Sequence, residues 1–363
     1  MRLATVFDRE SNEPRPVFEL PSGRRVELRE LFRPDDHGPD DELGEIPLYF
    51  TDLAKTVEFL DDVTDAVRQW SRERAESAGD LIARVEQEAR PTSVDTMPFL
   101  PPVPVVRAFR EFDSFEQHVK LWRAAQGLAM HPTWYESPTF TFANAASLIG
   151  HESPVYAPLG SEDLDFSLQL GLIIGRGGRN ITRKDAWKHV AGFTIVNAFV
   201  ARDFERQETS DAFIARGKSR DFATAVGPYL VSLGSLGDRI DGDDRIHLAM
   251  RALVNGKERS RAEASSMHFT WPQLIEHASR DAELFPGDLI TSGTAPGGSI
   301  LDARAGAKDE SIAWLKSGDV VELEVERLGT LRTPIIERPP SASGNAARNG
   351  AAASSQRRET LAV

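Results

Sequence analysis

The fold is decided by residues 163–203, DLDFSLQLGLIIGRGGRNITRKDAWKHVAGFTIVNAFVARD. Within them, apolar residues from Phe166 to Ile174 alternate with Ser167, Gln169 and Gly171. A period of two is typical of a strand, so this pattern predicts a strand with one apolar face. Ser167 and Gln169 therefore point to the same side of the sheet.

A glycine-rich turn at residues 175–178 ends this strand. Thr182 then offers an N-cap to a short helix predicted over residues 183–189, and a second strand is predicted over residues 192–201. The polar residues 203–222 follow and predict a long loop. The sequence thus indicates two neighbouring strands with a short helix between them and a loop after the second strand.

This stretch resembles the fumarylacetoacetate hydrolase superfamily. The pattern of that family is a strand D-x-E-x-E-L-A-x-x-I-G, a helix, and then G-x-x-x-x-N-D-x-S-A-R-D, and residues 163–203 follow it without a gap. More of the family's short motifs follow in order over about residues 105–335, and chance is a poor explanation for so many. They are Gly217-Lys218-Ser219, Val226 to Val231, Val254-Asn255-Gly256, Ser266-Met267, Pro286-Gly287-Asp288 and Gly293 to Gly297. The resemblance implies an α+β fold, in which a mixed β-roll catalytic domain follows a smaller N-terminal α/β domain.

The sequence departs from the family at the metal-binding carboxylates. Two strand glutamates and the aspartate of the N-D element hold a divalent metal in the family, and here these positions are Ser167, Gln169 and Ala198. Mg²⁺ is usually held by at least one or two carboxylates. We therefore expect no metal and no other cofactor, with a magnesium site as the alternative. Asp165 is the carboxylate that could rebuild such a site, because it shares a strand face with Ser167 and Gln169.

The resemblance also assigns catalytic roles to four residues. The family's general-base histidine follows an acidic metal ligand by seven residues, and Glu111 and His118 keep that spacing at the start of a predicted helix with Ser114 as its cap. Arg202 matches the arginine of the S-A-R-D element, and Lys218 matches a lysine that contacts substrate oxygens. From the residues alone, His118 would be a core histidine on an apolar helix face, and the two cations would be solvated.

Substrate contacts are expected from a further group of residues. The strand side chains of Ser167 and Gln169 lie where the family binds its ligand, and Glu205 stands where many relatives have glutamine. Gly293 and Thr294 begin a glycine-rich stretch whose backbone N–H groups could approach a substrate carboxylate. No Gly-Lys-Ser follows that stretch, so it is no nucleotide-binding loop.

Composition limits the classes of partner. The 363 residues carry a formal charge of −13, which argues against nucleic-acid binding because phosphate contacts need a basic surface. No cysteine is present, which excludes disulfides and thiolate chemistry. No apolar run is long enough to span a bilayer and no signal peptide is recognisable, so a cytoplasmic protein without membrane contact is expected.

The chain is expected to divide into three parts. Residues 1–97 predict an N-terminal domain of short strands with one long amphipathic helix over about residues 51–70, and a proline cluster at residues 91–104 marks its end. Residues 98–337 form the predicted catalytic domain. Residues 338–363 are rich in Pro, Ser, Ala, Asn and Gly and predict a disordered tail. Family analogy implies a homodimer.

Three functions are consistent with these residues. The first is an enzyme that acts without metal on a small 2-oxo acid or 1,3-dicarbonyl acid through an enolate, by carbon–carbon cleavage, decarboxylation, dehydration or tautomerisation. In it, Arg202 and Lys218 stabilise charge and His118 moves a proton. The second is a magnesium-dependent hydrolase with rearranged ligands, and the third is a non-catalytic binding or scaffold protein that kept the fold. We rank the metal-free enzyme first and expect its partner to be a small carboxylate substrate.

Overall fold

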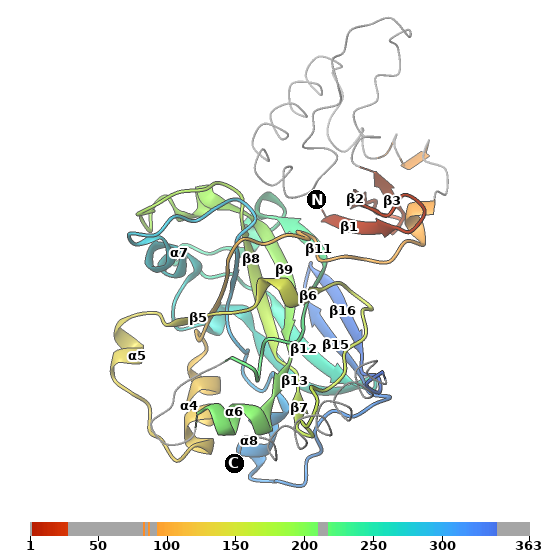
Figure 1. The fold of residues 1–363 in the computed structure, drawn as a ribbon. Helices are drawn as coiled ribbons and strands as arrows, with labels where there is room; N and C mark the ends of the chain where they lie inside the picture. The colour runs from red at the N-terminus through yellow and green to blue at the C-terminus, as the bar shows by residue number, and fades with distance from the viewer. Residues whose placement is uncertain (1, 28–82, 84–85, 88–92, 210–216, 340–363) are drawn as a thin grey trace, which may run out of the picture.

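The computed structural model describes residues 2–27, 83, 86–87, 93–209 and 217–339 (Figure 1). The predicted helix at residues 51–70 and residues 340–363 of the predicted tail lie outside the described residues. Within the described part, no helix has the length and apolar character needed to cross a bilayer.

A ten-stranded sheet forms the centre of the molecule, and β8 (Leu168–Ile174) and β9 (Val190–Ala198) lie in its middle (Figure 1). The strand order is β3-β2-β1-β11-β9-β8-β14-β4-β5, and β6 pairs with β11. The other strands are β1 Arg2–Asp8, β2 Glu13–Glu19, β3 Arg25–Glu27, β4 Phe109–Phe112, β5 Phe140–Phe142, β6 Leu148–Ile149, β11 Thr224–Ser232 and β14 Leu289–Thr291. Because β1 pairs antiparallel with β11, this sheet continues across the domain boundary predicted near residue 97.

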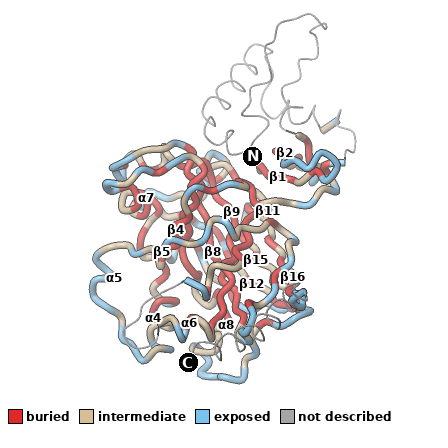
Figure 2. The backbone as a smooth tube through the Cα atoms, in the orientation of Figure 1, coloured by how far each residue is buried: buried red, intermediate tan, exposed pale blue. Residues whose placement is uncertain are grey.

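β8 is buried on both faces, although the alternation of its residues predicts only one buried face. Leu168, Leu170, Leu172 and Ile174 join the main hydrophobic core, and Ile173 on the opposite face joins a second cluster. On the other face, a Cβ atom at Gly171 would lie 2.7 Å from the side chain of Val196, so neighbouring side chains fill that space too. Figure 2 shows buried residues concentrated along these central strands. Ser167 and Gln169 are consequently held inside the protein, where polar groups need partners.

A second sheet completes the mixed β-roll. Its order is β13-β12-β15-β16, with β12 Ala249–Val254, β13 Lys257–Glu263, β15 Val320–Val325 and β16 Gly329–Pro334. Met250 of β12 and Leu323 of β15 belong to the same core cluster as Phe193 of β9. The two sheets therefore enclose one hydrophobic core. A separate two-stranded pair joins β7 Leu164–Asp165 to β10 Val200–Ala201.

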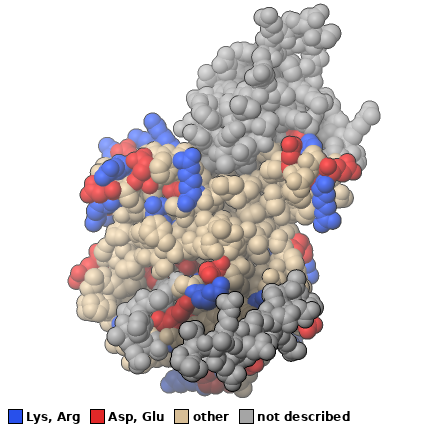
Figure 3. Space-filling model, in the orientation of Figure 1, with Lys and Arg blue, Asp and Glu red and all other residues tan. Residues whose placement is uncertain are grey.

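The α-helices around the sheets include α4 Glu116–Ala125, α5 Thr133–Glu136, α6 Arg202–Glu208, α7 Trp271–Ser279 and α8 Ile300–Ala307. α7 begins with a capping box in which Thr270 and Gln273 satisfy each other's backbone N–H groups. Sheets with a small number of helices give the α+β class that the resemblance implies. Charged side chains gather over α7 and the N-terminal strands on the face shown in Figure 3, and the band between them carries few charges.

One helix prediction and one cap prediction are wrong. Residues 183–189 contain only a 3₁₀ turn, Ala186–His189, because Thr182 donates its hydroxyl to Asp185 Oδ2 at 2.8 Å instead of capping a longer helix. Ser114 does not cap α4, whose N-cap is Phe115. The backbone of Ser114 is bonded to neighbouring loops, as donor to Ser292 and as acceptor from His268, and this delays the start of the helix.

α6 occupies the beginning of the predicted loop at residues 203–222. Its buried residues are Arg202 and Glu205, which are charged and give no apolar periodicity for a sequence pattern to detect. The helix nevertheless buries one side, because ion pairs satisfy both side chains. These ion pairs lead directly to the candidate active site.

Candidate active site

His118 and Asp302 form a buried pair between α4 and α8. His118 Nδ1 lies 2.7 Å from Asp302 Oδ1, and both side chains are buried. A carboxylate can only accept, so Nδ1 is the protonated nitrogen and Nε2 is left to exchange a proton. Asp302 is itself fixed, because its Oδ2 accepts from the Gly297 amide at 3.0 Å and its amide donates to Ser299 Oγ at 3.0 Å.

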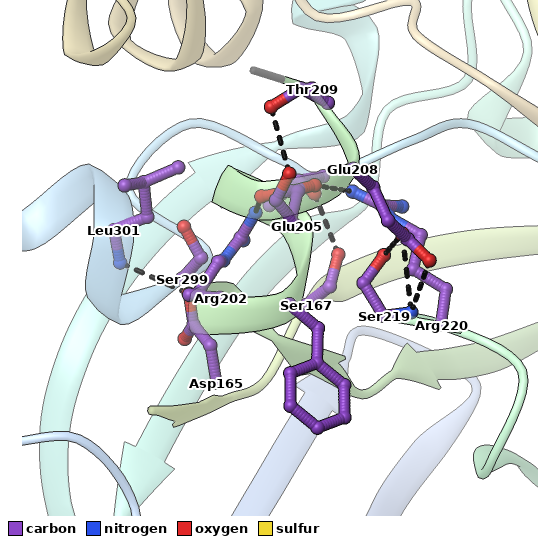
Figure 4. A network of polar contacts seen from close by, with 12 residues as sticks. Asp165, Ser167, Arg202, Glu205, Glu208, Thr209, Ser219, Arg220, Ser299 and Leu301 are labelled. Carbon is purple, nitrogen blue, oxygen red and sulfur yellow. Dashed lines mark hydrogen bonds and ion pairs between the residues drawn. The ribbon is translucent and has the colours of Figure 1, made fainter. Parts of the chain in front are cut away.

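α6 holds two of the charged residues in a buried network (Figure 4). Arg202 donates through Nε to Asp165 Oδ2 at 2.9 Å and through a terminal nitrogen to Glu205 Oε2 at 2.6 Å. Asp165 also accepts from the amides of Ile300 and Leu301 at 2.7 and 3.1 Å, so it caps the N-terminus of α8. Asp165 is thus engaged with a helix and an arginine.

Arg220 extends this network to Glu111 on β4. One terminal nitrogen of its guanidinium donates to Glu111 Oε2 at 2.8 Å, and the other donates to Glu205 Oε1 at 3.1 Å. Five charges therefore alternate in the order Glu111, Arg220, Glu205, Arg202 and Asp165. In this arrangement Glu205 bridges two guanidinium groups, which fixes the orientation of both.

The pKa values of the network follow from burial and charge. Burial by itself would lower the pKa of the Arg220 guanidinium, but the charges of Glu111 and Glu205 outweigh it and raise that pKa above its ordinary value. The same opposition holds for Arg202, where burial lowers the pKa and Glu205 and Asp165 raise it further than burial lowers it. Both arginines therefore stay charged inside the protein.

The strand residues in the former ligand positions bond to Glu111 and to each other. Gln169 Nε2 donates to Glu111 Oε1 at 2.6 Å and to Ser167 Oγ at 2.9 Å, which places both side chains on one face of the strand, as predicted. Ser167 Oγ also lies 2.6 Å from Thr294 Oγ1. Gln169 Oε1 is buried and accepts from no residue that the structure describes.

A cavity of about 320 Å³ opens beside His118 and Arg220. His118 and Arg220 both line it, together with residues of α4, α5 and the segment that joins them. The charged residues of its lining are Asp113, Arg123 and Arg220, with His118 and His131 as the titratable rings. The lining therefore includes two arginines and one aspartate, and Arg220 is also paired with Glu111 and Glu205 behind it. Arg123 and the remaining N–H donors of Arg220 favour an anionic ligand.

Lys218 is placed differently from the prediction. Its side chain is 66% exposed and its Nζ donates to both carboxylate oxygens of Asp221 at 3.0 and 3.1 Å. It does not line the cavity that contains His118. The cationic group that reaches Glu111 is Arg220, two residues later, so the expectation for Lys218 is corrected in favour of Arg220.

Gly293 packs against the backbone of β4, an approach that only a residue without a side chain allows. Its φ is +77°, and a Cβ atom there would lie 2.1 Å from the carbonyl oxygen of Phe112. We therefore expect Gly293→Ala to lower the free energy of unfolding by at least about 1–3 kcal/mol from backbone strain alone. Chemical denaturation measures the loss. Gly306→Ala is the control, because nothing lies within 4 Å of its Cβ and alanine in helix α8 should stabilise by roughly 0.5–1 kcal/mol.

A divalent metal does not fit the side chains present. Glu111 is the family ligand position that remains acidic, and its two oxygens are engaged by Gln169 and Arg220. A hard cation needs anionic oxygen ligands, and a guanidinium bound to Glu111 would repel it. In residues 93–209 and 217–339, as in the other described segments, no cluster of three or more His, Asp or Glu is arranged to hold an ion.

Arg220 and Asp302 are the two site residues that the sequence did not reveal. Arg220 directly follows the Gly217-Lys218-Ser219 motif. The signal in the sequence was that this arginine adds a second cation next to the motif. Asp302 lies three residues after Ser299, a spacing typical of the first turn of a helix. Neither signal indicates which side chain points into the protein.

Comparison with known proteins gives a consistent family. The family model described as fumarylacetoacetate hydrolase C-terminal matches residues 107–336. A mitochondrial oxaloacetate tautomerase of Xenopus laevis is 31% identical over 192 residues, 53% of this chain and 56% of that protein. A 2,4-didehydro-3-deoxy-L-rhamnonate hydrolase of a Sphingomonas strain is 35% identical over 192 residues, 53% of this chain and 62% of that protein. The chain thus matches little more than half the length of these relatives.

A solved structure extends the likeness in fold. The crystal structure of a probable 2-hydroxyhepta-2,4-diene-1,7-dioate isomerase from Mycobacterium abscessus aligns with a TM-score of 0.64 and 21% identity, over 94% of this chain and all of that one. At this identity the likeness supports the fold alone. Because the family model covers more than half of the residues, the chain belongs to the fumarylacetoacetate hydrolase superfamily.

Proposed function

We propose that this protein is an enzyme that interconverts the keto and enol forms of a small 2-oxo acid through an enolate, without a divalent metal. The observation that carries the proposal is the His118–Asp302 pair on the same cavity as Arg220. Two relatives are named oxaloacetate tautomerases, of Xenopus laevis and of Bacillus subtilis, and their names support this reaction type.

The proton transfer is assigned to His118. With Nδ1–H donated to Asp302, Nε2 takes a proton from the carbon next to the 2-oxo group. The electron pair of that C–H bond forms the new carbon–carbon double bond, and the π pair of the carbonyl moves to its oxygen. The same nitrogen then returns the proton to the enolate oxygen, which completes the keto-to-enol conversion with no other reactant. Tautomerisation needs only this transfer and a nearby positive charge, so it is the reaction of this class that depends least on a metal.

The substrate is assigned to the small carboxylic acids by the charge of the site. Arg123 and Arg220 line the cavity against one acidic residue, Asp113. A dicarboxylate such as oxaloacetate would be drawn into this cavity despite the negative charge of the whole chain. A volume of about 320 Å³ fits a molecule of this size.

The test is the rate of oxaloacetate tautomerisation, followed by the ultraviolet absorbance of the enol, above the rate in buffer. We expect the full chain to accelerate it after dialysis against EDTA, and added Mg²⁺ to leave the rate unchanged. Loss of activity on chelation and recovery with Mg²⁺ would overturn the metal-free part of the proposal. Cleavage of a 1,3-dicarbonyl acid into two products, with no tautomerisation, would assign hydrolysis instead.

The same assay separates an enzyme from a scaffold protein. A small-acid enzyme should also be stabilised by oxaloacetate or a related acid, which raises its melting temperature by mass action. If a broad set of 2-oxo and 1,3-dicarbonyl acids gives neither turnover nor a shift in melting temperature, the non-catalytic function is favoured.

A further inference from the structure

The position of Arg220 is unusual for a residue on a surface loop. Its side chain is 11% exposed, and both terminal nitrogens are held by carboxylates, at 2.8 Å from Glu111 and 3.1 Å from Glu205. Its Nε is buried and has no hydrogen-bond partner among the described residues. Because two acids fix its orientation and it lines a cavity, Arg220 is pre-organised to bind an anionic ligand there.

The guanidinium of Arg220 binds Glu111, the carboxylate that the family resemblance assigns to metal binding. Glu111 is the acidic position that this chain retains, and it is bound by Arg220 and by Gln169, which replaces a carboxylate. A metal-binding site would combine several carboxylates with one divalent ion. Here Glu111, a neutral amide and Glu205 surround Arg220, and Glu205 is shared with Arg202, so the loss of three acids is consistent with the added arginine.

We propose that the guanidinium of Arg220 takes the place of the divalent cation and binds the paired oxygens of the 2-oxo carboxylate of the substrate. This inference rests on the proposed function for the identity of the ligand. Glu111 and Glu205 each accept from one terminal nitrogen, which leaves Nε–H and the second N–H of a terminal nitrogen as parallel donors. Such a planar pair of donors matches two neighbouring oxygens in one plane. It stabilises the enolate oxygen by charge and hydrogen bonding, where a metal would do so by coordination.

Gln169 lies behind the Glu111–Arg220 pair. Its Nε2 donates to Glu111, and its Oε1 is buried without a donor among the described residues. It does not line the cavity, so the ligand contact in this inference is assigned to Arg220 alone.

Oxalate is the probe for this inference, because it is planar, carries paired oxygens and does not react. We expect calorimetry in EDTA to show that oxalate binds the wild-type chain with a Kd in the millimolar range or weaker. Arg220→Met should raise this Kd by about 10- to 100-fold, the effect of losing hydrogen bonds to a charged group. Arg220→Lys keeps the positive charge but loses the paired N–H donors of the guanidinium. Its affinity for oxalate should therefore lie between those of wild type and Arg220→Met.

Arg110→Met is the matched control. Arg110 precedes Glu111 on β4, is 7% exposed in its side chain, and pairs with Asp288 at 3.3 Å, so its loss also breaks a buried ion pair. It does not line the cavity, and oxalate affinity should be unchanged. Circular dichroism checks that each variant is folded, and Arg220→Met combined with Glu111→Gln removes the carboxylate charge that the single variant leaves without a cation.

Metal binding gives an independent readout. We expect wild type to bind Mn²⁺ weakly in a titration, and Arg220→Met to bind it more tightly, because Glu111 is then free of a guanidinium. Oxalate affinity that is unchanged in Arg220→Met, oxalate binding that requires Mn²⁺, or no binding by wild type would each overturn the inference.

The result also separates this inference from the proposed function. If oxalate binds through Arg220 but no 2-oxo acid is turned over, the anion site stands and the proposed function fails. If metal-free turnover survives in Arg220→Met at the wild-type rate, the function stands and the role of Arg220 fails.

Discussion

Arg202→Met is expected to lower the free energy of unfolding by about 3–5 kcal/mol, the cost of leaving buried charges without a partner. The guanidinium is buried and bonds to Asp165 at 2.9 Å and to Glu205 at 2.6 Å. Methionine is of comparable length and flexible, so the loss reports the missing charge more than a cavity. Chemical denaturation followed by circular dichroism measures it.

Arg206→Met provides the control for this variant within the same helix. Its side chain is 59% exposed and pairs with Asp163, and exposed pairs contribute at most about 1 kcal/mol. The two variants should therefore differ by several-fold in their effect on stability. Equal losses would show that the helix, and not the buried network, carries the stability.

The loss in Arg202→Met should also depend on pH in a direction that the pKa of Asp165 fixes. Burial raises the pKa of this carboxyl, although Arg202 and the amides of Ile300 and Leu301 oppose it, and removing Arg202 raises it further. A carboxyl whose pKa is higher in the folded state binds protons more readily when folded, so its protonation stabilises the fold. The loss of unfolding free energy in Arg202→Met, relative to wild type, should therefore become smaller as pH falls through the pKa of Asp165 and larger as pH rises through it.

The central strands could be predicted because their pattern is local. Alternation alone places Ser167 and Gln169 on one face, and the bond of 2.9 Å between them confirms it. The same alternation could not show that both faces of β8 are buried, since burial of the second face depends on residues such as Val196 of β9. A period of two gives the face that a residue occupies and not what covers that face.

The charged part of the site was harder to predict, because its partners come from distant segments. Arg220 meets Glu111 across 109 residues, and Asp302 meets His118 across 184. No local period connects such positions, and Lys218 is a better match to the family motif than Arg220 although its side chain faces solvent. The sequence indicated the loop that reaches Glu111 but not which of its cations does so, because the direction of a loop side chain is set by tertiary contacts.

His118→Gln is expected to lower kcat for oxaloacetate tautomerisation by about 10²–10⁴-fold, the usual contribution of a positioned acid or base. Glutamine keeps a polar side chain of similar size but cannot exchange a proton at neutral pH. The KM of the variant should change little, because the positive charge that binds the substrate carboxylate belongs to Arg220. Steady-state kinetics of folded protein measure both constants. His189→Gln is the matched control, because this histidine is half-buried away from the cavity, bonds to the carbonyl of Arg176 and should leave both constants unchanged.

Asp302→Asn tests whether the carboxylate works through the histidine. The carboxylate holds Nδ1–H at 2.7 Å, and an amide in its place can present N–H groups and stabilise the wrong tautomer. We expect kcat to fall by about tenfold or more with KM nearly constant. Because Asp302 acts through His118, the double variant His118→Gln with Asp302→Asn should be no slower than His118→Gln alone. Losses that multiply in the double variant would mean that Asp302 contributes by a separate route, and a normal kcat in Asp302→Asn would remove it from the proton transfer.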